Sequence, residues 1–176
     1  MAAMLVCGLV ANAQMVITPQ VGINLANMTN VDDSKMKVGL VAGANLECPV
    51  ADAFSVSAGL LYSMQGYKYD SSYGSYNVNM DYLNIPVLAQ YEVAPGLKIK
   101  AGVQPGFLMS AKADGNDFKD ACKSFDLSVP LGASYEISDF VIDARYNLGC
   151  TKTNKYGDES SKNSVIMLTV GYKIPF

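Results

Sequence analysis

The sequence contains no histidine and no tryptophan. Without histidine, Ser-His-Asp hydrolysis, Cys-His chemistry and His-ligated zinc sites are excluded. Charged residues make up only 16% of the 176 residues, well under the roughly 25% of an average soluble domain. The formal net charge of −3 offers no basic surface for nucleic acid. Half of the residues are hydrophobic, yet no apolar run is long enough to span a bilayer as a helix. The apolar residues are therefore spread along the chain.

The N-terminal segment 1–13 (MAAMLVCGLVANA) carries no charge and ends in an A-x-A triplet. An apolar stretch closed by such a triplet is typical of a cleaved secretory signal. We therefore predict cleavage between Ala13 and Gln14 and a mature domain at 14–176. The basic residues that usually begin a signal are missing, so a truncated or misassigned start and a buried first strand are the alternatives.

From Gln14 onward, apolar residues alternate with polar or small residues, which is the spacing of β-strands. No stretch keeps a 3.6-residue period long enough to indicate a helix. Short and long polar connections alternate along the chain, as in an antiparallel meander. The pattern predicts one all-β domain, an eight-stranded antiparallel up-and-down barrel. The predicted strands are 17–25, 38–46, 54–64, 83–93, 97–109, 125–137, 140–148 and 166–176, and the long loops lie near 30–34, 68–79, 113–121 and 152–163.

Glycine indicates which face of this barrel points inward. Of the 15 glycines, most of those on strands share the face of the polar residues. Glycine weakens a strand, but in the narrow interior of an eight-stranded barrel it leaves space for a neighbouring side chain. We therefore predict a polar interior and an apolar, lipid-facing exterior, as in a transmembrane barrel. The alternative is a soluble lipocalin-like barrel with its apolar face inward, which would bind a ligand.

The predicted inward face carries charges of both signs. Opposite charges enclosed together can pair, whereas an unpaired one would cost several kcal/mol. Eight strands leave little room for a pore, so we predict a packed ion-pair plug; an aqueous or proton pathway is the alternative. The predicted interior network comprises Glu92, Lys98, Lys100, Asp126, Asp143 and Arg145, and Glu47, Glu136 and Lys173 lie on the same face.

Aromatic residues fall at two levels of the apolar face. Phe125 and Tyr135 are ten residues apart on one strand, which corresponds to roughly 25 Å for a strand tilted by about 40°. That is the height of the lipid-facing band in small barrels. The spacing predicts two interfacial belts.

Two segments carry a resemblance to a known family. Residues 81–88 (DYLNIPVL) and 97–112 (LKIKAGVQPGFLMSAK) resemble the "Y-L-x-I-P" and "G-x-Q-x-G-x-L-x-S-A-K" strands of the Bacteroidetes outer-membrane β-barrel family, also called the porin family or PorT-like, with eight strands as in OmpX and OmpA. The alternating C-terminal residues Tyr172, Ile174 and Phe176 resemble the signal that the barrel-assembly machinery reads. The resemblance implies a bacterial outer-membrane location, periplasmic termini, extracellular long loops, and lipid and the assembly machinery as partners.

Prolines stand inside three of the predicted strands, at positions 86, 105 and 130. Proline cannot donate to a strand ladder. If the fourth and fifth strands pair about Pro95, Pro86 lies opposite Gln104 or Pro105. The clustering predicts a local bulge or kink.

Three cysteines follow the predicted signal. Cys122 and Cys150 both lie toward the long-loop end and are a candidate disulfide, and the odd count leaves Cys48 or another thiol free or intermolecular. Against the bridge, hairpin pairing sets Cys150 opposite Leu127 rather than Cys122.

The remaining polar segments predict no catalytic or cofactor site. The acidic loop 114–120 lacks the order of an EF-hand, so a solvated loop is preferred to a calcium site, and no metal or cofactor is expected. The tyrosine-rich segment 67–76 has a composition that could contact a glycan or a protein, but a solvated loop with interfacial tyrosines is preferred. We predict a non-enzymatic barrel with a structural or surface-interaction role; the alternative is a PorT-like barrel in secretion with unknown partners.

Overall fold

The computed structural model describes residues 14–29, 34–71, 74–113, 116–117, 119, 123–151 and 162–175. The predicted signal segment, Cys122, Phe176 and most of the acidic loop lie outside these residues. Nearly all described residues are in strands, as alternation with a period of two predicts. Within the described ranges, no helix is long and apolar enough to cross a membrane.

Eleven strand segments form one antiparallel sheet. β4 and β5 together occupy one position in the sheet, as do β10 and β11, and β7 is a two-residue addition to β6. The sheet closes because β1 pairs with β10, from Gln20 opposite Gly171 to Thr29 opposite Lys162. The predicted eight-stranded antiparallel barrel is therefore confirmed. The segments are β1 (Val16–Thr29), β2 (Ser34–Ala51), β3 (Phe54–Ser71), β4 (Gly74–Asn84), β5 (Val87–Ala94), β6 (Leu97–Ala113), β7 (Asn116–Asp117), β8 (Phe125–Ile137), β9 (Phe140–Gly149), β10 (Lys162–Tyr172) and β11 (Ile174–Pro175).

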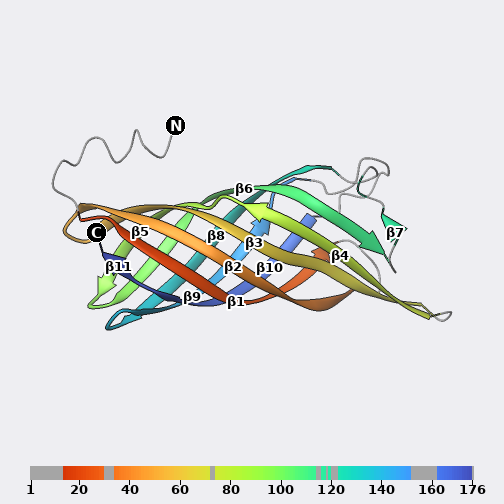
Figure 1. Cartoon of the computed structure of the whole chain (residues 1–176), viewed down its shortest axis with the longest axis horizontal. Helices are drawn as coiled ribbons and strands as arrows, with labels where there is room; N and C mark the ends of the chain where they lie inside the picture. Colours follow the sequence, from red (N-terminus) through yellow and green to blue (C-terminus); the bar gives the residue numbers. More distant parts are fainter. Residues whose placement is uncertain are drawn as a thin grey trace.

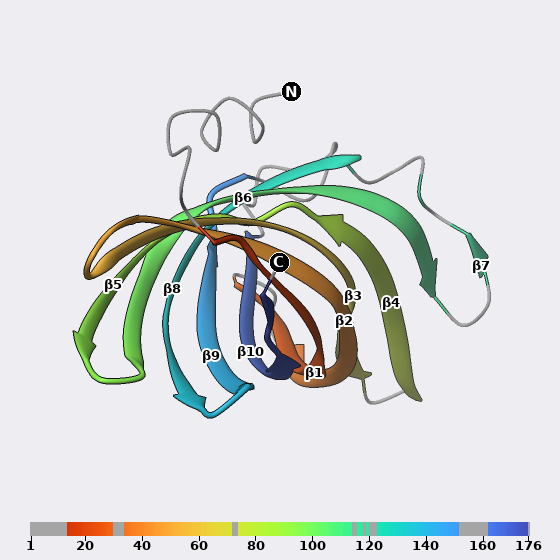
Figure 2. The ribbon, with the colours of Figure 1, turned by 60° about the vertical axis from the view of Figure 1, so that its left-hand side comes forward.

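The two ends of the barrel differ. Tight turns join β2 to β3, β5 to β6 and β8 to β9 at the end where the chain also finishes, on the left in Figure 1. The β8–β9 turn needs a left-handed residue, Ser138 (φ 54°), and the β5–β6 turn uses Gly96 (φ 78°). We call this end the turn end and the opposite end the loop end. Figure 2 shows the strands tilting around a closed wall.

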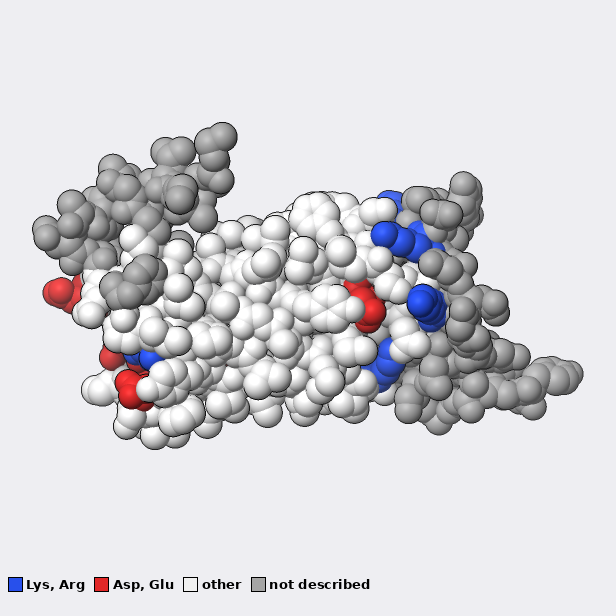
Figure 3. Space-filling view, viewed as in Figure 1, with Lys and Arg blue, Asp and Glu red and all other residues white. Residues whose placement is uncertain are grey.

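The apolar face of every long strand points outward. Leu131, Ile142 and Leu168 are 45%, 41% and 47% exposed, while the polar residues between them are buried. Figure 3 shows a broad uncharged band, with most of the visible charge gathered toward the two ends. Because a lipocalin-like barrel has the opposite arrangement, the soluble ligand-binding alternative is wrong.

Aromatic side chains mark both edges of the apolar band. At the turn end, the rings of Phe140 and Tyr172 meet edge to face with centroids 5.3 Å apart. Toward the loop end, Phe107 and Phe125 do the same at 5.7 Å. Rings at such levels suit an interface between hydrocarbon and water.

The predicted fourth strand is not continuous. It breaks at Ile85–Pro86, and β4 and β5 lie on either side. Ile85 N donates to Pro105 O at 2.8 Å, and Val87 pairs with Val103. Pro86 therefore lies opposite Gln104, which is one of the two registers predicted from the sequence. Two neighbouring prolines that cannot donate account for the break.

The predicted long loop at 68–79 is wrong. β3 and β4 continue as a hairpin as far as Ser71 opposite Gly74. The pairing of β4 with β6 ends at Val78 opposite Ala113, and the hairpin extends beyond that point. Figure 1 shows this arm projecting at the loop end.

Candidate functional site

The barrel interior gathers most of the buried polar groups of the described chain. Inward-facing positions of β1, β3, β4, β5, β6, β8, β9 and β10 carry them, because the period of two sends every second side chain inward. They include two of the four cationic side chains of the two clusters described below, Lys98 and Arg145. The buried polar residues are Thr18, Gln20, Asn24, Ser55, Ser57, Ser63, Gln65, Asn84, Gln90, Lys98, Gln104, Ser128, Ser134, Asp143, Arg145, Asn147 and Thr169.

Near the turn end, three side chains on strands and one on the residue after β10 form the first ion-pair cluster. Lys98 Nζ lies 2.7 Å from Glu47 Oε1 and 2.6 Å from Glu136 Oε1. Lys173 Nζ lies 2.5 Å from Glu136 Oε2. Two lysines and two glutamates thus balance one another and join β2, β6 and β8 to the residue after β10.

One layer deeper, a second cluster lies around Asp143 on β9. Lys100 Nζ approaches Asp143 Oδ2 at 2.6 Å, and Arg145 Nε approaches Asp143 Oδ1 at 2.5 Å. All three side chains are almost fully buried, at 8%, 3% and 1% exposure for Lys100, Asp143 and Arg145. Here two cations share one carboxylate.

The other two residues of the predicted network lie elsewhere. Glu92 lies at the mouth of the turn end, where its carboxylate accepts from the Gly96 amide at 3.2 Å. Asp126 lies toward the loop end and accepts from the Thr151 hydroxyl at 2.5 Å. Of the predicted network, the structure brings Lys100, Asp143 and Arg145 together in the second cluster and places Lys98 in the first. Glu92 lies opposite Lys98 in the β5–β6 register, and Asp126 lies apart from both clusters.

The interior also holds an apolar layer that the sequence reasoning missed. Val41, Leu61 and Met167 pack together and are wholly buried, and the inward Tyr82 is 1% exposed. These residues share the parity of the polar face, so their position on the strand was the available signal. Their residue types gave none, because lipid-facing positions use the same types.

Glycines make the interior packing feasible. A Cβ on Gly132 would lie 2.6 Å from Arg145 Cγ, and one on Gly106 would lie 2.5 Å from Asn84 Oδ1. Real Cβ atoms do not approach other atoms so closely, so each larger side chain occupies the space that its glycine leaves. This matches the reasoning that assigned the polar face to the interior.

No disulfide joins two cysteines within the described residues. Cys150 is an exposed free cysteine at the end of β9, and its amide donates to Leu127 O at 2.7 Å, the register expected from the sequence. Cys48 is buried near the turn end. Since Cys122 lies outside the described residues, its pairing with Cys150 stays a prediction.

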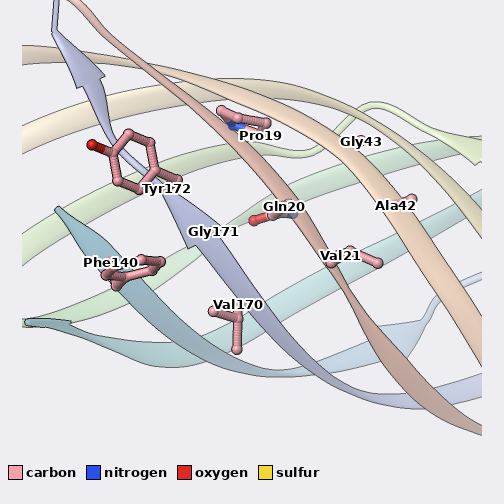
Figure 4. Close-up of a pocket in the computed structure, with 9 residues that line it drawn as sticks. All are labelled: Pro19, Gln20, Val21, Ala42, Gly43, Phe140, Val170, Gly171 and Tyr172. Carbon is pink, nitrogen blue, oxygen red and sulfur yellow. The ribbon is translucent and has the colours of Figure 1, made fainter.

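The outer wall is grooved where the barrel closes. A groove of about 430 Å³ crosses the β1–β10 seam, and Figure 4 shows Phe140, Val170 and Tyr172 beside it. Gly43 and Gly171 line it without side chains. The edge is also interrupted here: Pro19 has no amide hydrogen, and β10 ends at Tyr172 before β11 begins at Ile174.

These contacts tie side chains together across the interior. Every carboxylate of the two clusters is engaged by a cation at hydrogen-bond distance, so the clusters present no free acid or base. The two clusters therefore link strands to one another inside the closed wall.

Comparisons with known proteins agree with this geometry. The model of the family described as "Outer membrane protein beta-barrel domain" matches residues 12–154. Among curated protein sequences, none matches the chain.

Solved structures share the fold. Neisserial surface protein A has a TM-score of 0.60 at 15% identity, over 91% of this chain and 97% of that one. Ail of Yersinia pestis, in complex with the heparin analogue sucrose octasulfate, has 0.55 at 16%, over 92% and 99%. OprG of Pseudomonas aeruginosa has 0.51 at 13%, over 92% and 96%.

Proposed function

The chain belongs to the outer membrane protein β-barrel domain family, and we propose that its role there is non-enzymatic, with an interior closed to solutes and a loop end that contacts surface partners. The family resides in the bacterial outer membrane, so lipid surrounds the apolar wall. The similar solved structures are outer-membrane barrels rather than enzymes.

One observation carries the proposal of a closed interior. Two successive layers of ion pairs, around Lys98 and around Asp143, span the inside of the wall. The apolar layer of Val41, Leu61 and Met167 lies beyond them toward the loop end. A solute would have to separate buried ion pairs, which is costly in a low-dielectric interior.

Conductance in planar bilayers tests this closure. The purified full chain should show no sustained openings. A Lys98→Ala, Arg145→Ala double variant should conduct more, because it removes one cationic side chain from each layer. Lys112→Ala, at an exposed outward position, is the matched control and should behave as the unaltered chain does. Sustained discrete openings of the unaltered chain contradict a closed interior.

We also propose that the turn end faces the periplasm and the loop end faces outward. The short turns and the end of the chain lie together (Figure 1), and short periplasmic turns with longer extracellular loops are the usual arrangement in outer-membrane barrels. A membrane-impermeant maleimide on intact cells should label a chain whose single cysteine is Cys150. A matched chain whose single cysteine is introduced by Asp139→Cys, at the exposed β8–β9 turn, should react only after lysis. The reverse result inverts the orientation.

The surface role rests on the arm formed by β3 and β4, which extends beyond the β6 pairing. Ail was solved with a heparin analogue, which makes a sulfated glycan a reasonable first ligand to test. Cells that carry the full chain should retain more of such a glycan than cells with a chain in which residues 69–76 are replaced by a two-residue turn, at equal surface amounts. Equal retention removes glycan binding from the proposal.

A PorT-like role in secretion is the second candidate, and it rests on the DYLNIPVL and LKIKAGVQPGFLMSAK segments alone. Co-purification of secretion components with the full chain would favour it. The signal peptide at 1–13, with cleavage between Ala13 and Gln14, stays a prediction that N-terminal sequencing of the mature protein tests. The assembly signal at Tyr172, Ile174 and Phe176 likewise stays a prediction.

A further inference from the structure

The guanidinium of Arg145 is only partly engaged by the protein. Its Nε lies 2.5 Å from Asp143 Oδ1, but Nη1 and Nη2 are buried and have no hydrogen-bond partner among the described residues. The whole residue is 2% exposed. A buried donor without a partner loses its hydration with nothing in return, so a ligand or water that accepts from these two atoms would remove this cost.

The charge around Arg145 is also unbalanced. Lys100 and Arg145 share the single carboxylate of Asp143. The cluster nearer the turn end holds two lysines and two glutamates and balances its own charges. One positive charge therefore remains in the second layer, where an uncompensated buried charge is strongly unfavourable.

Further hydrogen-bond donors lie on the strands that flank Asp143 and on β9 itself. Ser134 on β8 and Thr169 on β10 both pair with Asp143 in register, so they flank it on the two neighbouring strands. The Oγ of Ser134 and the Oγ1 of Thr169 are buried without a partner, as is Nδ2 of Asn147, two residues beyond Arg145. Hydroxyl and amide groups are donors that an anion can use.

We propose that the barrel interior holds one small monovalent anion, of the size of chloride, bound by Nη1 and Nη2 of Arg145 with the hydroxyls of Ser134 and Thr169 as further donors. Water molecules could satisfy the hydrogen bonds, but they would leave the positive charge of the second layer uncompensated. The anion satisfies both. This site goes beyond the proposed role, because it needs a closed interior but no surface partner.

Bromide, which replaces chloride and scatters anomalously, tests the site directly. Crystals of the full chain grown in bromide should show an anomalous peak within hydrogen-bond distance of Arg145 Nη1 or Nη2. Peaks of water alone at this place, with no anomalous signal, overturn the proposal.

Linkage gives a second, independent measurement. The folding equilibrium constant of the full chain in lipid vesicles is measured as chloride replaces gluconate at constant ionic strength. An anion that binds only the folded state multiplies this constant by one plus the ratio of its concentration to its Kd. Once chloride exceeds its Kd, each tenfold increase in chloride concentration should therefore raise the folding constant by close to tenfold. An unchanged constant for the unaltered chain also overturns the proposal.

Variants assign the effect to the site. Arg145→Met should abolish the chloride dependence, and Thr169→Val, which keeps the charge cluster intact, should shift it to higher chloride. Lys112→Met removes an exposed cation outside the interior and should leave the dependence unchanged. Equal loss in Lys112→Met would mean general screening rather than a site. These readouts are independent of conductance, so an open lumen and an absent anion give different results.

Discussion

Leu131→Arg should destabilise the barrel strongly, because the outer wall faces hydrocarbon. Leu131 lies on the outward face of β8, between Phe125 at the loop-end belt and Tyr135 at the turn-end belt, and it is 45% exposed. Each residue advances about 2.5 Å along the membrane normal in a strand tilted by about 40°. Leu131 therefore lies roughly 10 Å from one belt and 15 Å from the other, near the midplane.

An arginine at the midplane of such a barrel costs about 2–4 kcal/mol, and one at the interface about 0–1 kcal/mol. Leu131→Arg should therefore lose about 2–4 kcal/mol, and Tyr135→Arg, on the same strand and face, about 0–1 kcal/mol. The measurement is the free energy of unfolding by guanidinium in phospholipid vesicles, followed by tyrosine fluorescence and by migration on a gel. In water, both substitutions would stay within about 0.5 kcal/mol. Equal, small losses at the two positions would refute the lipid-facing assignment.

Three further predictions concern the interior and the C-terminus. Asp143→Ala leaves two buried cations on one site and should cost about 3–5 kcal/mol, against less than about 0.5 kcal/mol for Asp139→Ala at the exposed turn, in the same unfolding assay. Gly132→Ala sets a Cβ 2.6 Å from Arg145 Cγ and should cost about 1–3 kcal/mol of unfolding free energy. Ala133→Gly, at the next residue on the outward face, removes one methyl group and should lower the unfolding free energy only by the weaker preference of glycine for a strand. A milder effect of Gly132→Ala than of Ala133→Gly would contradict the crowded interior. Phe176→Ala should reduce the fraction of the chain that shows heat-modifiable migration in cells without changing the stability of refolded protein; an equal loss in both would point to folding rather than to assembly.

The faces of the barrel could be predicted because a strand sends alternate side chains to opposite sides. Leu127, Val129 and Leu131 follow that rule without exception, and the predicted orientation holds along all eight positions in the sheet. The rule gives no answer where polar residues occupy both faces of a strand. Residues 68–77 are polar on both faces, so their extension of the hairpin leaves no alternation to read.

The composition of the interior was less predictable than its location. The sequence identified Lys98, Lys100, Asp143 and Arg145 as inward residues, but which of them meet depends on the stagger of neighbouring strands. Glu92 lies opposite Lys98 in register, but its carboxylate accepts from the Gly96 amide, and Asp126 lies toward the other end. Leu61 was missed because lipid-facing positions use the same residue type, although its parity along β3 is that of the polar face.

The seam between β1 and β10 joins the beginning of the described chain to its end, as Gln20 opposite Gly171 shows. A chain that stops before β10 would keep two open sheet edges, and each unpaired amide or carbonyl at such an edge costs several kcal/mol in hydrocarbon. Partial barrels therefore have no stable place within the bilayer. The ribosome must finish the polypeptide before insertion becomes favourable, so a premature stop even a dozen codons early should yield material for periplasmic proteases rather than a smaller barrel.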